Sequence, residues 1–345
     1  MIKLPLNTSF AHRPCDALQL SAILAHPDAS HWLADHYLDI YIHRDYIHES
    51  WNGFLDADAM YTCPFLIQNS ISRTFLDGTR ISLPELLIDA LKDQHYIFCC
   101  VNKFYIPHYV EYHKIKTPHH LIVYGYDTEE NVFFIADFIK GKFRQFTCTS
   151  SELEDGIRFC NIENLDQYDS YMGVELLKSY LDTIFFVKLN NKIPYEFNRN
   201  LLLCSLNRYI EGQPPQGLDY IPYGLRINEL AFGLSLLDIC KTIIKETNEF
   251  DVKPFYLMKM HKQIMEQRLC YLANNKYIHN IDECLFVNSQ LMQLYTTLYM
   301  LVLKFDMTSW KSIASNKLID LIQEAEKLEH HNTDAIISHI LNDSA

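Results

Sequence analysis

The clearest structural pattern in the sequence is PHHLIVYGYD, residues 118–127, followed by FFIADF, residues 133–138. The first has the apolar and aromatic composition of a β-strand that begins at a histidine, and the second predicts a returning strand that closes on Asp137. The polar segment TEEN, residues 128–131, separates the two and favours a hairpin. Because side chains on neighbouring strands can meet, we expect the histidine and the acid to lie close together.

A cysteine near the start of the chain extends this pattern. Cys15 follows Pro14 and precedes ALQLSAIL, so it falls on the first turn of a predicted helix. The unpaired N–H groups and the dipole of a helix N-terminus favour a thiolate. A thiol, an imidazole base and an orienting carboxylate together make a nucleophile. We therefore predict a catalytic triad of Cys15, His119 and Asp137.

Alternatives to this triad stay open. Consecutive strand residues point to opposite faces, so only one of His119 and His120 can reach Cys15. We take His119 as the base and keep His120 as the alternative base. Each triad residue also has a structural interpretation on its own: a small buried cysteine, a satisfied core histidine, and an acid at a strand end.

Composition limits the class of protein. With 345 residues the chain exceeds the usual size of one domain, so two domains are expected. A formal net charge of −13 argues against bulk attraction to nucleic acid. No apolar run reaches the roughly 18 residues that a membrane span needs, and the first residues lack the apolar region of a signal peptide. Ten cysteines without such a signal predict reduced thiols and a cytoplasmic location.

No bound cofactor or metal is expected. The sequence has no Walker loop and no GxGxxG pattern, which argues against dependence on nucleotides. Several histidines lie between residues 108 and 120, but their irregular spacing and the absence of HExxH favour ordinary histidines over a metal site.

The secondary structure that the sequence predicts changes near residue 190. Helix and strand patterns mix over residues 1–190, whereas residues 191–345 carry apolar stripes at helical spacing. Ser82 and Glu85 form a capping pattern that predicts a helix start, and the closely spaced strands favour an antiparallel sheet. We predict an α+β fold, with a catalytic domain over 1–190 and a helical bundle domain over 191–345. Besides the hairpin, strands are expected at 96–101, 103–112 and 142–148, and long helices at 226–246, 253–273, 282–305 and 309–331.

The chain as a whole resembles papain-like cysteine acyltransferases of the type of the N-terminal domain of butirosin biosynthesis protein H. It is also similar to amide-forming enzymes of thiotemplate peptide assembly of the closthioamide kind. In papain-like enzymes the histidine is followed by five mostly apolar residues and then Gly-Tyr, which His119 satisfies with Gly125 and Tyr126. The resemblance rests on Cys15 with ALQL, VNKFYIPHY (101–109), HHLIVYGYD with FFIADF and KGKF, YGLRINEL, and FYLMKMHKQIMEQRLCYL.

The resemblance implies a papain-like catalytic domain that works as an acyltransferase of secondary-metabolite, nonribosomal-peptide-like biosynthesis. An acyl group held as a thioester on the phosphopantetheine of an acyl or peptidyl carrier protein would pass to Cys15. A small-molecule amine would then take it as an amide, with His119 as base and later acid and Asp137 as orienting carboxylate. Two other functions stay open: a papain-like hydrolase, either peptidase or thioesterase, with the same triad, and a non-catalytic scaffold protein of a biosynthetic complex.

The resemblance departs from the papain-like pattern at the oxyanion hole. Papain-like enzymes place a glutamine about six residues before the cysteine, and here that position is Ser9. The backbone N–H of Cys15 is one candidate donor, and Asn7, Ser9 and His12 are the candidates for the second. As partners we expect a carrier protein and an amine, with no nucleic acid and no membrane, and homo-oligomerisation left open. The densest basic cluster is a candidate surface for the carrier protein: Lys241, Lys245, Lys253, Lys259 and Lys262.

Overall fold

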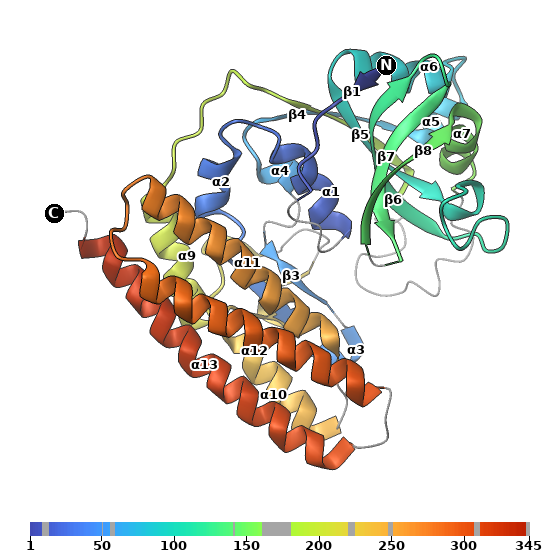
Figure 1. Cartoon of the computed structure of the whole chain (residues 1–345). Helices are drawn as coiled ribbons and strands as arrows, with labels where there is room; N and C mark the ends of the chain where they lie inside the picture. The colour runs from blue at the N-terminus through green and yellow to red at the C-terminus, as the bar shows by residue number, and fades with distance from the viewer. Residues whose placement is uncertain are drawn as a thin grey trace. The chain divides into compact units, whose positions relative to one another are not determined.

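The computed structural model describes residues 1–8, 14–49, 51–55, 59–140, 142–160, 181–219, 225–247, 251–306 and 311–342. The protein is α+β, with an antiparallel sheet and a C-terminal set of helices (Figure 1). Its contacts define two compact units. Unit 1 comprises Met1–Ala29 and Asp58–Tyr195, and unit 2 comprises Ser30–Ala57 and Glu196–Ala345. Residues 30–57 thus group with the C-terminal helices.

Unit 1 is built around a seven-stranded antiparallel sheet in the order β4-β9-β5-β6-β7-β8, with β1 paired to β6. The predicted hairpin and the predicted strands at 96–101 and 142–148 are confirmed. The bounds are β1 Ile2–Lys3, β4 Leu66–Ser72, β5 His95–Asn102, β6 Pro118–Asp127, β7 Val132–Ile139, β8 Lys142–Thr149 and β9 Thr183–Leu189.

The strand predicted over 103–112 is wrong. Lys103–Tyr105 forms a 3-10 turn, η2, because the side chain of Asn102 accepts a hydrogen bond from the N–H of Phe104 at 3.1 Å. Pro107, which lacks an N–H, also cannot donate to a strand ladder. The chain turns instead and brings Tyr109 to a buried position.

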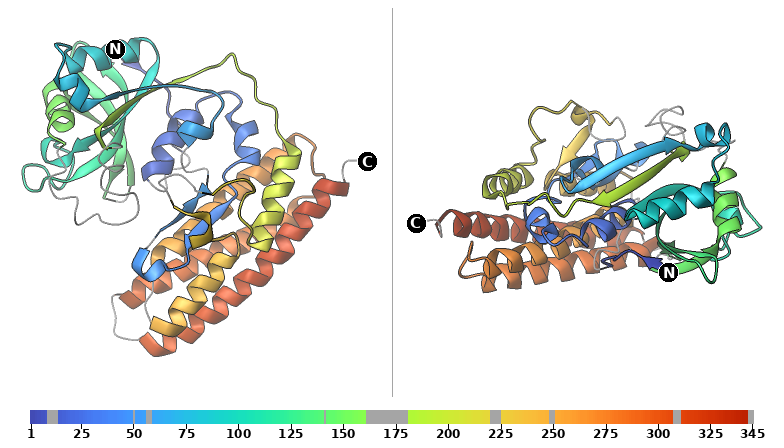
Figure 2. Two further views of the ribbon diagram at one scale, coloured as in Figure 1. Left: turned by 180° about the vertical axis from the view of Figure 1, so that it is seen from behind. Right: turned by 90° about the horizontal axis from the view of Figure 1, so that it is seen from above.

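Helices cover the sheet of unit 1. As predicted, Ser82 caps α6 by accepting a hydrogen bond from the N–H of Glu85, and the helix buries an apolar face. α6 and α7 contact β5, and α1 contacts β6 and β7 (Figures 1 and 2). The helices are α1 Pro14–Ile23, α4 Ala59–Thr62, α5 Arg73–Asp77, α6 Leu83–Lys92 and α7 Ser150–Arg158.

Unit 2 contains the long helices and a small antiparallel sheet in the order β10-β2-β3. The helices predicted at 253–273, 282–305 and 309–331 are confirmed as α11 to α13. The bounds are α2 Ala29–Asp35, β2 Ile40–His43, α3 Tyr46–Glu49, β3 Asn52–Phe54, α9 Arg199–Glu211, η5 Ile227–Glu229, β10 Leu230–Phe232, α10 Ser235–Thr247, α11 Val252–Asn274, α12 Asp282–Asp306 and α13 Lys311–Asn342.

The helix predicted over 226–246 forms only in its second half, as α10. Residues before it pair as β10 with β2, and the N–H of Gly233 donates to the carbonyl of Ile40 at 2.9 Å. Gly233 has a φ of +51°, and a Cβ at this position would lie 2.1 Å from the carbonyl oxygen of Tyr209. Only glycine fits such a left-handed, closely packed position, so the helix cannot run through it.

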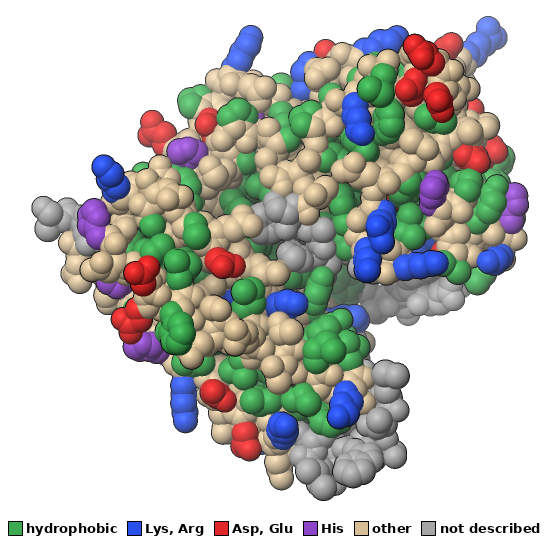
Figure 3. Space-filling view, in the orientation of Figure 1, with side chains coloured by type: hydrophobic (Ala, Val, Ile, Leu, Met, Phe, Trp, Pro, Cys, Tyr) green, Lys and Arg blue, Asp and Glu red, His purple; other side chains and the backbone are tan. Residues whose placement is uncertain are grey.

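The predicted basic cluster is not one free surface. Lys262 is 1% exposed and forms an ion pair with Glu329 at 2.5 Å inside unit 2. Lys241 pairs with Asp238 and Glu326, each at 2.8 Å. On the face shown in Figure 3, acidic and basic side chains are both scattered over the two units. Within the described ranges, none of the helices has the length and apolar character needed to cross a membrane.

Candidate active site

The structure brings His119 and Asp137 together. Ile122 on β6 lies opposite Ala136 on β7, so Asp137 comes one residue further along β7, beside the end of β6 that carries His119. His119 Nε2 lies 3.1 Å from Asp137 Oδ2. The two atoms are at ion-pair distance, although their alignment falls short of a hydrogen bond. With Nε2 facing the acid, Nδ1 is the ring nitrogen left to exchange a proton with a thiol.

The two side chains differ in their exposure to solvent. The side chain of Asp137 is 0% exposed, while that of His119 is 23% exposed. A carboxylate removed from water is costly unless charged or hydrogen-bonding groups surround it, so the partners of Asp137 matter for stability as well as chemistry. The pair therefore joins a fully buried acid to an imidazole that solvent or a substrate can reach.

Tyr109 is a third member of the site that the sequence patterns do not predict. Its hydroxyl donates a hydrogen bond to Oδ2 of Asp137, the same oxygen that faces His119. The rings of Tyr109 and His119 meet edge to face, with centroids 5.9 Å apart and planes at 83°. Burial, and then the charge of Asp137, raise the pKa of Tyr109 well above its usual range, which keeps the hydroxyl protonated as a donor.

Further contacts fix the segment that carries Tyr109. Lys103 Nζ lies 5.3 Å from the centroid of the Tyr109 ring, and it also lies 3.4 Å from Glu111 Oε1. On another side, the ring of Phe146 packs edge-on at 6.1 Å. Pro107 inside the expected strand was the sequence signal that this segment turns, and the turn is what delivers the hydroxyl to Asp137.

His120 occupies the opposite face of β6. Val101 of β5 lies opposite His119, and Cys100 lies opposite His120, so the two histidines alternate across the sheet. Nε2 of His120 is shielded from solvent, and burial, with a smaller contribution from His119, lowers the pKa of His120 to about 4. An imidazole with so low a pKa is a weak base near neutral pH. The geometry favours His119 over His120 as the base.

Helix α1 carries Cys15 on its first turn and begins at Pro14, as the sequence predicts. The side chain of Cys15 lies outside the described part of the chain. The helix contacts β6 and β7, the two strands that carry His119 and Asp137. Leu18 and Ala22 of α1 belong to the same buried apolar cluster as residues of these strands. The backbone thus holds the cysteine helix on the strands of the His–Asp pair.

Of the side chains predicted as the second oxyanion donor, Asn7 lies within the described residues. Ser9 and His12 lie outside the described residues. Asn7 donates its backbone N–H to the carbonyl of Ser21 at 2.8 Å. Ser21 is about 9 Å along the helix from Cys15, at 1.5 Å per residue. This position weighs against Asn7 as the second donor.

No metal site competes with this interpretation within the ranges that the structure describes, because no group of three or more His, Cys, Asp or Glu side chains there could hold an ion. A scan against models of protein families and a search of curated proteins both find no match. The geometry around His119 and Asp137 is therefore the structural observation that bears on function.

Proposed function

We propose that this protein is a cysteine acyltransferase with a papain-like catalytic domain. It takes an acyl group from a carrier-protein thioester onto Cys15 and passes it to an amine, forming an amide. The observation that carries the proposal is that α1, whose first turn holds Cys15, packs on the two strands that hold His119 beside the buried Asp137. The place in secondary-metabolite biosynthesis comes from the family resemblance.

In the first half-reaction, His119 accepts the thiol proton of Cys15 at Nδ1, and the thiolate attacks the carbonyl carbon of the thioester. The buried carboxylate of Asp137 stabilises the imidazolium that forms. The tetrahedral intermediate then expels the phosphopantetheine sulfur, which takes the proton back from His119. One thioester replaces another, so this exchange is close to isoenergetic.

In the second half-reaction, an amine attacks the acyl-Cys15 carbonyl. His119 accepts a proton from the attacking nitrogen and returns it to the sulfur of Cys15 as the carbon–sulfur bond breaks. An amide is more stable than a thioester, so this step runs downhill. A hydrolase would use the same groups with water as the acceptor, and the difference lies in which nucleophile reaches the acyl-enzyme.

The test is acylation of the full chain followed by intact-mass measurement. We expect incubation with acyl-pantetheine thioesters, or with an acyl-loaded carrier protein, to add one acyl mass to the wild-type protein. Cys15→Ala should abolish the adduct. Cys270→Ala, which removes an exposed cysteine of unit 2, serves as the matched control and should keep it.

Two outcomes contradict the proposal. If wild type gains no adduct, or if the adduct survives in Cys15→Ala, covalent catalysis through Cys15 is wrong. Once an adduct forms, candidate amines are added and the products are identified. Amide as the main product supports the transferase, whereas free acid that is unaffected by any amine identifies a hydrolase.

A further inference from the structure

Two cysteines outside the candidate site face each other in unit 1. Cys100 Sγ on β5 lies 3.4 Å from Cys160 Sγ, just after the end of α7. The two residues are 3% and 1% exposed. A disulfide has a sulfur–sulfur distance of about 2.05 Å, so the two atoms need to approach by only about 1.3 Å to bond. Neither thiol has a role in the proposed acyl transfer.

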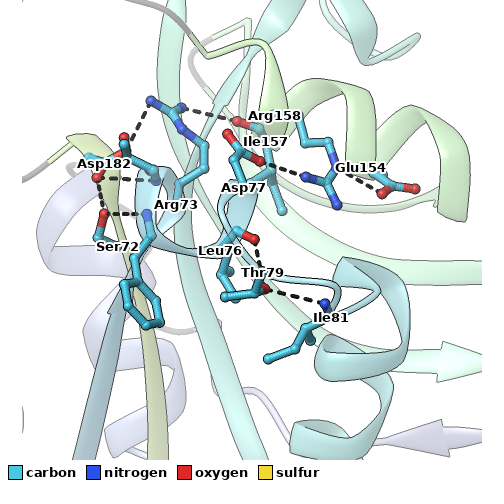
Figure 4. A network of polar contacts seen from close by, with 12 residues as sticks. Ser72, Arg73, Leu76, Asp77, Thr79, Ile81, Glu154, Ile157, Arg158 and Asp182 are labelled. Atoms are coloured by element: carbon cyan, nitrogen blue, oxygen red, sulfur yellow. Dashed lines mark hydrogen bonds and ion pairs between the residues drawn. The ribbon is translucent and has the colours of Figure 1, made fainter.

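The backbone on the Cys160 side is fixed by the partly buried Arg73. The guanidinium of Arg73 donates to the carbonyl oxygens of Ile157 and Cys160, at 3.0 and 2.8 Å. The same group pairs with Asp182 at 3.3 Å, and Figure 4 shows Arg73 reaching between Asp182 and the end of α7. Arg73 therefore holds the main chain at Cys160 in place.

The Cys100 side is fixed by the sheet. Cys100 sits within the β5–β6 ladder opposite His120. Two residues along β5, Asn102 Nδ2 donates to the carbonyl of Phe159 at 3.0 Å, which ties the strand end to the residue before Cys160. Hydrogen-bonded backbone therefore fixes the positions of both cysteines and holds the two sulfurs close together.

The two thiols differ in character. The hydrogen bond between the two thiols, and then the charge of Arg73, lower the pKa of Cys160, whereas burial raises the pKa of Cys100. Thiolate character determines which of two cysteines reacts first with an oxidant. Cys160 is therefore the sulfur expected to react first, with Cys100 placed to resolve the product.

We propose that Cys100 and Cys160 form a redox modification site that closes to an intramolecular disulfide with a small peroxide. The Cys160 thiolate attacks one peroxide oxygen, the O–O bond breaks, and a sulfenic acid forms with release of hydroxide. Cys100 loses its proton and attacks the Cys160 sulfur, and a second hydroxide leaves as the S–S bond forms. Two thiols are oxidised to one disulfide, and hydrogen peroxide is reduced to two waters.

The disulfide would form close to the candidate active site. Val101, the residue after Cys100 on β5, lies opposite His119 on β6. Oxidation would therefore form the disulfide one ladder position away from the main chain of His119. The disulfide itself depends on neither Cys15 nor acyl transfer, so its test stands apart from that of the proposed function.

The experiment oxidises the full chain with hydrogen peroxide, blocks the remaining thiols with N-ethylmaleimide in denaturant, and sequences the proteolytic peptides by mass spectrometry without reduction. We expect a linked pair of peptides containing Cys100 and Cys160, two hydrogens lighter than the sum of its parts and separated by dithiothreitol. Cys160→Ser should abolish the link. Cys99→Ala, which removes the buried neighbour of Cys100 on the opposite face of β5, should keep it.

A second measurement distinguishes loss of the disulfide from misfolding of one variant. The link would close a loop between residues 60 positions apart, so oxidation should raise the melting temperature of wild type and of Cys99→Ala. It should leave both Cys160→Ser and Cys100→Ala unchanged. Recovery of both cysteines as maleimide adducts from folded, peroxide-treated protein overturns the proposal, as does a link that joins Cys160 to Cys99.

Discussion

At the scale of single residues, the buried carboxylate of Asp137 decides what its neighbours must be. It has no exposed surface, so its charge is stabilised by the imidazole of His119 and by the hydroxyl of Tyr109, both directed at Oδ2. Removing a group that stabilises a buried charge lowers the free energy of unfolding measurably, because the charge is left without its partner.

Tyr109→Phe deletes the hydroxyl that donates to Asp137 and leaves the ring in place. We expect the free energy of unfolding to fall by about 1 to 3 kcal/mol, since a buried carboxylate loses a hydrogen bond. Urea unfolding followed by circular dichroism measures this. Tyr105→Phe, in the same segment and half-buried, is the control and should change stability by less than about 0.5 kcal/mol. Equal losses of stability in both variants would show that the hydrogen bond from Tyr109 to Asp137 does not stabilise the fold.

His120 gives a prediction about pH. Because burial lowers its pKa to about 4 in the folded protein, the unfolded chain binds a proton below about pH 6.5 that the folded chain does not. The stability contributed by neutral His120 is therefore present above pH 6.5 and is lost as the pH falls toward 4. Between pH 6.5 and 5, wild type should lose about 1 to 2 kcal/mol more than His120→Gln in urea unfolding. Parallel losses in the two proteins would contradict the burial of this imidazole.

At the scale of elements, the sequence predicts those whose pattern is local and misses those set by distant contacts. The hairpin β6–β7 follows from its apolar strands and polar turn, and with it the meeting of His119 and Asp137. By contrast, Tyr109 reaches Asp137 only because Asn102 caps the turn after β5. The sequence predicts helix where β10 forms, because the partner strand β2 lies far away in the sequence. Periodicity carries no information about such pairings.

Gly233 tests this account of the β10–α10 junction. Gly233→Ala would place a Cβ 2.1 Å from the backbone oxygen of Tyr209, in addition to the strain of a positive φ. The matched control is Gly217→Ala, at a φ of +79° with nothing within 4 Å of the new Cβ. We expect the control to lose about 1 kcal/mol from backbone strain and Gly233→Ala to lose at least about 2 kcal/mol more. Thermal or urea unfolding measures both, and similar losses would mean that the close approach to Tyr209 is unimportant.

At the scale of the whole molecule, all three residues of the proposed triad belong to unit 1. Unit 2 is compact in its own right, and its buried polar groups serve its own interior. Lys262, for example, pairs with Glu329, which also accepts a hydrogen bond from Tyr295 at 3.0 Å. The chemistry of the proposal is therefore tested by substitutions in unit 1 of the full chain.

Whether Cys15 is an activated thiol is measured by the rate at which iodoacetamide alkylates it at pH 7, followed by peptide mass spectrometry. An ordinary thiol with a pKa of about 8.5 is only about 3% ionised at this pH, so activation can raise the rate up to about thirtyfold. We predict that Cys15 reacts much faster than the exposed Cys204 and Cys270, that His119→Ala slows it to their rate, and that His120→Ala does not. A Cys15 rate equal to that of the exposed cysteines, or one that depends on His120 and not on His119, would contradict the account.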